Sequence, residues 1–91
     1  MASKYTKSAR GRECQVRLPC CNGDPATTVL AHLNGGGMGM KRDDRHGAFA
    51  CGACHDELDR RTRKMDSEYV KLCHLEGIIR TQEIWIREGL L

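Results

Sequence analysis

The stretch CGACHDELDRR, residues 51–61, places cysteine, histidine and carboxylate side chains close together in the sequence. Cys51 and Cys54 form a CxxC pair, and the two-residue gap lets both sulfur atoms face one zinc ion. A structural zinc site needs two further ligands, because such sites are almost always tetrahedral. We therefore expect this stretch to supply half of a metal site that other cysteines complete.

The other ligands are sought among the remaining cysteines of a chain that has six in 91 residues. Cys14 and Cys21 flank a loop and precede the turn Asn22-Gly23, so they are the predicted partners of the CxxC pair. Cys20 is the alternative to Cys21, because adjacent cysteines rarely both bind one ion. Four thiolates would close the coordination sphere, so this ion is expected to be structural Zn²⁺ rather than catalytic. The predicted zinc ligands are Cys14, Cys21, Cys51 and Cys54.

The size of the chain and its first residues are consistent with a metal-stabilised intracellular domain. A chain of 91 residues is long enough for one domain, and chains this short usually need disulfides or a metal. Residues 1–12 are polar and basic and lack the apolar core of a signal peptide. No apolar run reaches membrane-spanning length. We expect a cytoplasmic protein with reduced thiols and no membrane partner, built as a basic N-terminal arm (1–12) and a single domain (13–91).

A β-hairpin is predicted before the CxxC pair. Residues 27–33 (TTVLAHL) are rich in strand-forming residues, and residues 48–50 are the predicted return strand. Side chains alternate between the two faces of a strand, which would place His32 on the face opposite the core. The glycine-rich residues 35–39 read as a loop and lack the Lys-Ser/Thr ending of a phosphate-binding loop. The predicted core-facing residues are Val29, Ala31 and Leu33.

Two helices are predicted after the hairpin. The first runs from residue 51 to about residue 64, and the second from Asp66 or Ser67 to about Glu88, with Gly89 as its stop. The second helix is apolar on two sides, so it would pack against two surfaces. In so short a chain the second surface could belong to another subunit, which would give a homodimer through the C-terminal helix. The two sets are Tyr69, Val70, Cys73 and Ile84, and Leu72, Leu75, Ile79 and Ile86.

A candidate active site combines the hairpin and the first of these helices. His55 and Asp59 stand one helical turn apart on one face and could chelate a divalent ion with room left for water and phosphate. His32, near the end of the first strand, could take a proton from an attacking water. Taken alone, each pattern is more typical of an ordinary polar pair or of a histidine bonded to backbone. Their order along the chain favours one site, and His46 and His74 are weaker candidates.

This order resembles that of the HNH (ββα-metal) nucleases, and most closely the small YbcO-like prophage family of predicted nucleases. The resemblance covers nearly the whole chain and implies an α+β fold, with a small zinc-stapled ββα-metal (HNH-like) core, a β-hairpin and a long C-terminal helix. It implies His32 as general base and His55 and Asp59 as ligands of Mg²⁺ or another divalent cation. The segments that carry it are residues 10–17, 21–23, 29–32, 50–61 and 76–85.

The chain departs from the HNH pattern at three places. Ala31 stands where the residue before the general base commonly serves as a metal ligand. The middle Asn has no clear counterpart, and His46 or Asp44 is nearest. The first cysteine pair is C-x₆-C rather than CxxC.

The expected function is therefore metal-dependent hydrolysis of phosphodiester bonds by a phage- or prophage-encoded enzyme in a bacterial host. The alternative is a non-catalytic zinc module that binds DNA or a recombination partner, which the absent ligand at Ala31 favours. The net charge is +3, and two basic clusters suit a nucleic-acid partner, which we expect to be DNA. The predicted phosphate-contacting residues are Arg10, Arg12, Arg17, Arg60 and Arg61.

Overall fold

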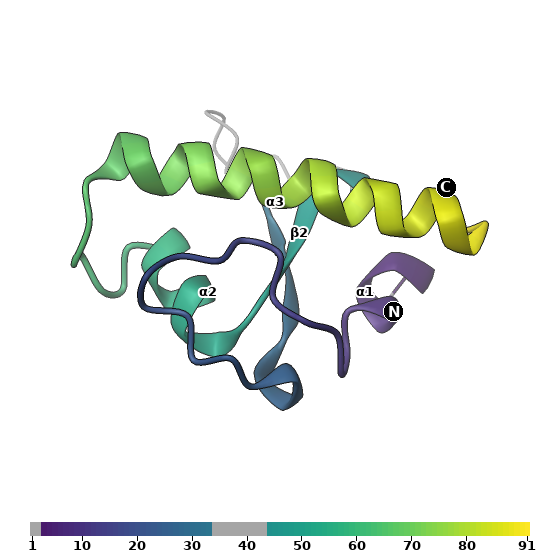
Figure 1. The fold of residues 1–91 in the computed structure, drawn as a ribbon, viewed down its shortest axis with the longest axis horizontal. Helices are drawn as coiled ribbons and strands as arrows, with labels where there is room; N and C mark the ends of the chain where they lie inside the picture. The colour runs from purple at the N-terminus through teal and green to yellow at the C-terminus, as the bar shows by residue number, and fades with distance from the viewer. Residues whose placement is uncertain (1–2, 34–43) are drawn as a thin grey trace.

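The computed structural model describes residues 3–33 and 44–91 and shows an α+β chain with one antiparallel hairpin and a long C-terminal helix (Figure 1). The glycine-rich stretch 35–39 and most of the predicted polar loop lie outside the described residues. Among the described helices, none is both long and apolar enough to span a bilayer. The elements are α1 (Lys4–Ser8), η1 (Pro25–Thr27), β1 (Val29–His32), η2 (Asp44–His46), β2 (Gly47–Ala50), α2 (Gly52–Leu58) and α3 (Ser67–Glu88).

The hairpin is confirmed, but the predicted facing of its first strand is wrong in part. β1 and β2 pair with Leu30 opposite Phe49. Val29 is 41% exposed, whereas Leu30 is buried. Both faces of the hairpin are covered, since Ala31 packs in one buried cluster and Leu30 packs in a second with Phe49 and Trp85. A strand covered on both faces does not show the simple alternation on which the prediction rested.

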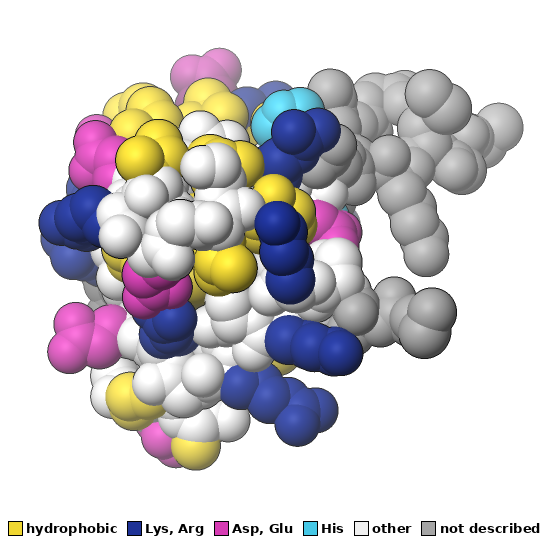
Figure 2. All heavy atoms as spheres, turned by 90° about the vertical axis from the view of Figure 1, so that its right-hand side faces the viewer, with side chains coloured by type: hydrophobic (Ala, Val, Ile, Leu, Met, Phe, Trp, Pro, Cys, Tyr) yellow, Lys and Arg dark blue, Asp and Glu magenta, His cyan; other side chains and the backbone are white. Residues whose placement is uncertain are grey.

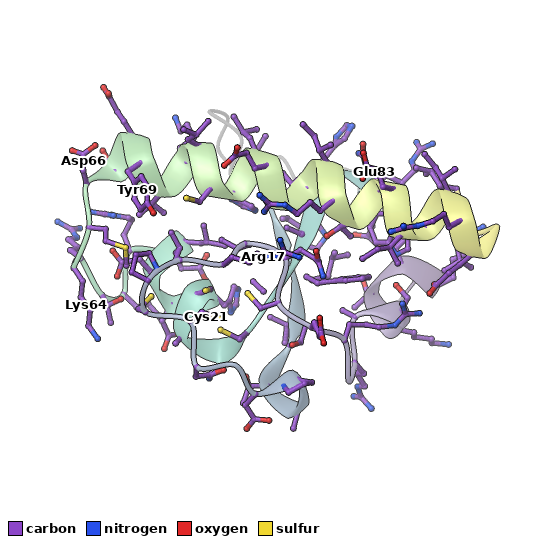
Figure 3. The ribbon with its side chains drawn as sticks, viewed as in Figure 1. Arg17, Cys21, Lys64, Asp66, Tyr69 and Glu83 are labelled. Atoms are coloured by element: carbon purple, nitrogen blue, oxygen red, sulfur yellow. The ribbon has the colours of Figure 1, made fainter. Side chains whose placement is uncertain are left out.

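α3 crosses the hairpin and packs mainly on β2 (Figure 1). Its predicted caps are confirmed: the Asp66 carboxylate accepts hydrogen bonds from two amides of the first turn, and Gly89 ends the helix in the left-handed region (φ 78°). Asp66 is seen at the start of the helix in Figure 3. The buried side of α3 consists of Val70, Cys73, His74, Gly77, Ile78, Thr81 and Trp85.

α2 is shorter than predicted, because it ends at Leu58 rather than near residue 64. Arg60 adopts a left-handed backbone conformation (φ 60°) that a helix does not allow. The side chain of Glu57 is fully buried and accepts hydrogen bonds that hold the following loop against α2. These bonds come from the Thr62 hydroxyl at 2.5 Å and the amides of Lys64 and Met65 at 3.2 and 3.0 Å.

The basic N-terminal segment contains a short helix, α1, which the sequence analysis does not predict. The Tyr5 ring lies 4.8 Å from the Trp85 ring, measured between centroids. Trp85 Nε1 donates to Ser8 Oγ at 2.8 Å, and the Tyr5 hydroxyl donates to the Leu90 carbonyl at 3.0 Å. The two ends of the chain therefore lie side by side (Figure 1).

Candidate active site and metal centre

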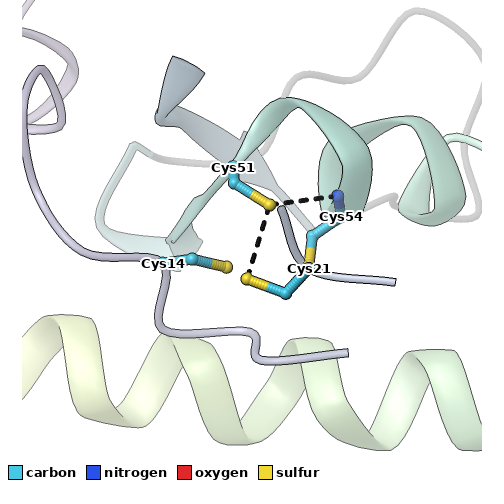
Figure 4. Close-up of side chains that lie close together, drawn as sticks. All are labelled: Cys14, Cys21, Cys51 and Cys54. Atoms are coloured by element: carbon cyan, nitrogen blue, oxygen red, sulfur yellow. Dashed lines mark hydrogen bonds between the residues drawn. The ribbon is translucent and has the colours of Figure 1, made fainter. Parts of the chain in front are cut away.

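Four cysteine sulfur atoms from distant parts of the chain converge on one point. The Sγ atoms of Cys14, Cys21, Cys51 and Cys54 all lie within 4.8 Å of one another (Figure 4). The Sγ atoms of Cys21 and Cys51 are 3.6 Å apart. Two thiolates on a tetrahedral zinc ion, with bonds of about 2.3 Å, are separated by about 3.8 Å. The spacing and the all-sulfur donor set therefore fit a metal ion such as zinc.

Local backbone contacts explain how these cysteines meet. The amide of Gln15 donates to the carbonyl of Phe49 at 2.7 Å, which holds the Cys14 segment beside the end of β2. Cys21 follows a turn closed by a 2.9 Å bond from its own amide to the Leu18 carbonyl. Cys51 caps α2 by accepting from the Cys54 amide at 3.4 Å. The N-terminal loop, held against β2, and the start of α2 thus each bring one cysteine pair to the same place.

The competition between Cys20 and Cys21 has a clear structural outcome. Cys21 belongs to the cluster, whereas the Cys20 sulfur faces the Ala53 carbonyl at 3.8 Å. Cys73 is buried in the hydrophobic cluster that also contains Cys51 and Cys54. The structure therefore brings together the four cysteines that the sequence analysis selects.

The crowding of thiols changes their acidity. A hydrogen bond from the Cys54 thiol lowers the pKa of Cys14 to about 4, and the same contact raises the pKa of Cys54. The thiolate is the metal-binding form of cysteine. The close contact of the sulfur atoms therefore favours the thiolate form at Cys14.

His55 and Asp59 form the predicted pair at the end of α2. Nε2 of His55 lies 3.2 Å from Oδ2 of Asp59, and both side chains are about one-third exposed, at 34% and 35%. Two adjacent ligands of an octahedral ion with bonds of about 2.1 Å lie about 3.0 Å apart. The pair therefore has the right spacing to bind one divalent cation. Within the described chain, however, the four cysteines are the only group that brings three or more such ligands together.

His32 lies at the end of β1 with its imidazole against Asp44, the first residue of η2. Nε2 of His32 is 2.6 Å from Oδ1 of Asp44. The Asp44 carboxylate also accepts from Ser3 and, at 3.3 Å, from Thr6. The Ser3 hydroxyl, followed by His32, lowers the pKa of Asp44. The sequence analysis notes Asp44 only as a neighbour of the missing Asn and misses this contact, which arises from the folding of the hairpin.

His74 contacts the strand that carries His32. It is buried on α3, and its Nε2 donates to the carbonyl of Ala31, the residue before His32, at 2.9 Å. Burial lowers the pKa of His74, and the hydrogen bond to the Ala31 carbonyl acts in the opposite direction. His46 is exposed, and its carbonyl accepts from the Leu33 amide.

The N-terminal arginines occupy different environments. Arg12 donates to both carboxylate oxygens of Glu88 at 2.5 and 2.7 Å, so its charge is already compensated. Arg17 adopts a positive φ of 59° and donates to the Gln15 side chain at 3.4 Å. Arg10 is exposed. Lys and Arg side chains are grouped on the end of the molecule shown in Figure 2.

The second group of arginines belongs to the loop between α2 and α3. Arg60 lies 3.6 Å from the buried Glu57 carboxylate. The Arg61 side chain is 72% exposed and lies 3.9 Å from Asp56. This group adjoins Asp59, whereas Arg10, Arg12 and Arg17 come from the first segment of the chain.

Comparisons with known proteins agree on one family. The family model described as "Putative nuclease YbcO" matches residues 3–90. Two relatives with that description, from Escherichia coli (strain K12) and Enterobacteria phage 82, are each 55% identical over 89 residues, covering 93% of this chain and 93% of the relative. A solved structure, "a putative bacteriophage protein from Escherichia coli str. K-12 substr. MG1655", superposes with a TM-score of 0.84 at 55% identity, covering 93% of this chain and 99% of the other.

Proposed function

This chain belongs to the YbcO nuclease family, and on that premise we propose that it is an HNH-type endonuclease that cuts DNA with a divalent metal ion. The two relatives come from a bacterium and a phage, which supports a role in phage or prophage DNA processing inside the bacterial cytoplasm. The observation that carries the proposal is the contact between His32 and Asp44 at 2.6 Å; the His55–Asp59 pair at 3.2 Å on the following helix supports it.

The contact with Asp44 supports a general-base role for His32. An ionised carboxylate only accepts hydrogen bonds, so Nε2 of His32 carries the proton and Nδ1 keeps its lone pair. Nδ1 can take a proton from a water molecule as the water oxygen attacks phosphorus. The bond from phosphorus to the leaving oxygen then breaks, and that oxygen takes a proton from solvent. Asp44 orients the imidazole and stabilises its charged form, in the way that a carboxylate supports a catalytic histidine.

His55 and Asp59 are the proposed ligands of the catalytic cation. A bound Mg²⁺ or similar ion supplies positive charge to the phosphoryl and leaving oxygens. The chain contributes two ligand atoms at 3.2 Å on the last turn of α2. Because Ala31 carries no ligand atom, a cation held by His55 and Asp59 would take its other ligands from water and the substrate phosphate. Such an open site is compatible with Mg²⁺, which usually retains several waters.

The four-cysteine cluster is proposed to hold Zn²⁺ with a structural role. All four ligands are protein sulfurs, so no position would remain for substrate. The cluster joins the N-terminal loop to the start of α2, which carries His55 one residue after Cys54. Zinc would thereby stabilise the segment that carries His55 and Asp59.

Phosphate contacts are proposed for Arg10, Arg17, Arg60 and Arg61. Their guanidinium groups can neutralise backbone phosphates without reading sequence. Arg12 is a weaker candidate than the sequence analysis suggests, because its guanidinium group already donates to both carboxylate oxygens of Glu88.

The proposed activity is tested by incubating supercoiled plasmid with the zinc-loaded protein and either Mg²⁺, Mn²⁺ or EDTA. Nicking or linearisation with a divalent ion, abolished by EDTA, is the expected result. A second function is favoured by one observation, the alanine at position 31, which leaves the proposed catalytic ion only two protein ligands. Binding of the plasmid without cleavage under any metal would support this alternative, a non-catalytic DNA-binding zinc module.

A homodimer through α3 remains our proposal for the assembly. The side of α3 that faces away from the hairpin exposes large apolar side chains, and contiguous exposed apolar surface often marks an interface. Hydrophobic side chains gather near the C-terminal end of α3 in Figure 2. The exposed residues and their exposed fractions are Leu72 54%, Leu75 41%, Ile79 58% and Ile86 60%.

A further inference from the structure

A hollow of about 180 Å³ opens beside the candidate active site, between the loop after α2 and the first turns of α3. Its position follows from residues already described, since His74 on its wall bonds the carbonyl next to His32 and Arg60 follows Asp59 in the chain. The residues that line it are Leu33, Leu58, Arg60, Ser67, Val70, Lys71 and His74.

The rim of the hollow is cationic. Lys71 is exposed on α3, and no carboxylate among the residues of the described ranges lies within ion-pair distance of it. Arg60 is anchored, because its Nη1 donates to the Met65 carbonyl at 3.2 Å and its backbone is held in the left-handed region. Two positive side chains from different elements thus line one opening. Arg60 also lies 3.6 Å from the Glu57 carboxylate, whereas the charge of Lys71 has no ion-pair partner among residues 3–33 and 44–91.

The floor of the hollow is apolar. Leu58 and Val70 are buried, with exposed fractions of 6% and 3%, and Leu33 is partly buried. The His74 side chain also lines the hollow. Pockets that hold drug-sized ligands have volumes of about 300–1,000 Å³, so this hollow has room for a single ring system. Proteins that bind single strands combine cationic side chains with ring surfaces on which bases stack; in this hollow three aliphatic side chains and the His74 ring take the place of that platform.

We propose that this hollow is a subsite for one nucleotide next to the scissile phosphate, with its base over Leu33, Leu58 and Val70 and its phosphate between Lys71 and Arg60. The proposal rests on the proposed nuclease function for the identity of its ligand. It assigns Lys71 and the apolar floor, neither of which takes part in the hydrolysis described above.

The test is an NMR titration of the ¹⁵N-labelled, zinc-loaded His32→Ala protein with a short oligothymidylate, without added Mg²⁺, so that no cleavage occurs. We expect amide shifts at Leu33, Leu58, Val70 and Lys71. Lys71→Ala should weaken binding about fivefold. It should also reduce the magnitude of the slope of log K against log salt by about 1, the change expected when one phosphate contact is lost. Arg87→Ala is the matched control: it removes one cation from the same helix about 24 Å along its axis and should leave the affinity unchanged.

Two results would overturn the subsite. One is equal affinity of the Lys71→Ala and Arg87→Ala proteins; the other is the same shifts at equal affinity with inorganic phosphate alone, which would show that the apolar floor recognises nothing. The subsite and the nuclease activity fail separately. If oligothymidylate shifts these amides but the wild-type protein never cuts plasmid, the subsite is retained and the nuclease activity is refuted. If the wild-type protein cuts plasmid but these amides do not shift, the nuclease activity is retained and the subsite is refuted.

Discussion

Nε2 of His32 and Oδ1 of Asp44 lie 2.6 Å apart, although twelve positions separate the two residues in the chain. The contact joins the end of β1 to η2 immediately before β2, so it is produced by the closure of the hairpin. A carboxylate held this close sets the tautomer of an imidazole and its orientation. The function of the chain is best tested at this pair.

If His32 is the general base, His32→Ala should reduce the rate of plasmid nicking by about 10²- to 10⁴-fold. Asp44→Asn should reduce it by about 10- to 100-fold, as expected for a residue that acts through the orientation of another. His46→Ala changes an exposed histidine of η2 and should retain the wild-type rate. Initial rates with Mn²⁺ measure all three, and a His32→Ala protein that cuts normally would remove His32 from the mechanism.

Cys21 and Cys20 offer a test of the metal centre with adjacent residues. Cys21→Ser should lower the bound zinc, measured by atomic absorption, and destabilise the fold, because metal binding and folding are coupled in small domains. Cys20→Ser should keep one zinc per chain and a wild-type melting curve. Loss of zinc from the Cys20 variant, with retention in the Cys21 variant, would reverse the assignment.

Glu57 should make stability dependent on pH. The Thr62 hydroxyl, and then the amides of Lys64 and Met65, lower the pKa of this carboxyl in the folded protein. Its contribution is therefore fully present above the usual pKa of an unfolded glutamate, about 4.3, and is lost as pH falls through the lower folded value. We expect Glu57→Gln to lower the urea midpoint at pH 7, with a difference from wild type that shrinks toward pH 3.

The exposed Glu83, on α3 (Figure 3), supplies the control for this measurement. Glu83→Gln should have nearly the wild-type midpoint at both pH values. A Glu57→Gln deficit that stays constant from pH 7 to pH 3 would show that shape, rather than charge, accounts for the effect.

Gly77 should resist substitution. A Cβ atom at this position would lie 3.1 Å from the Gln15 carbonyl oxygen and equally close to two carbon atoms of Val16. Helix propensity favours alanine over glycine by about 1 kcal/mol, but overpacking costs about 1–3 kcal/mol. We expect Gly77→Ala to lower the free energy of unfolding, whereas Glu76→Ala on the exposed face should not. A Gly77→Ala protein more stable than the wild type would mean that the backbone at Gln15 and Val16 moves aside at little energetic cost.

The proposed dimer predicts a change of mass in solution. Ile79→Glu places a charge at the centre of the exposed apolar side of α3 and should convert a dimer into a monomer in sedimentation equilibrium. Glu83→Gln on the same helix should leave the mass unchanged. A wild-type protein that sediments as a monomer at all concentrations would exclude this assembly.

Local signals predict much of this fold. Asp66 and Gly89 mark both ends of α3, because caps depend on single side chains. The CxxC pair indicates the metal centre, because its spacing determines where the two sulfurs can point. The end of α2 could not be predicted, since it depends on the Glu57 carboxylate binding groups five to eight residues later. The Asp44 contact and the docking of α1 likewise depend on tertiary structure.

The placement of Tyr5 against Trp85 and Leu90 has a consequence for the order of folding. A helix as short as α1 is not stable alone in water, and the carbonyl that Tyr5 binds is 85 positions away in the chain. We therefore expect α1 to form only after the end of α3 is in place, so that its amides exchange with solvent faster than those of the hairpin.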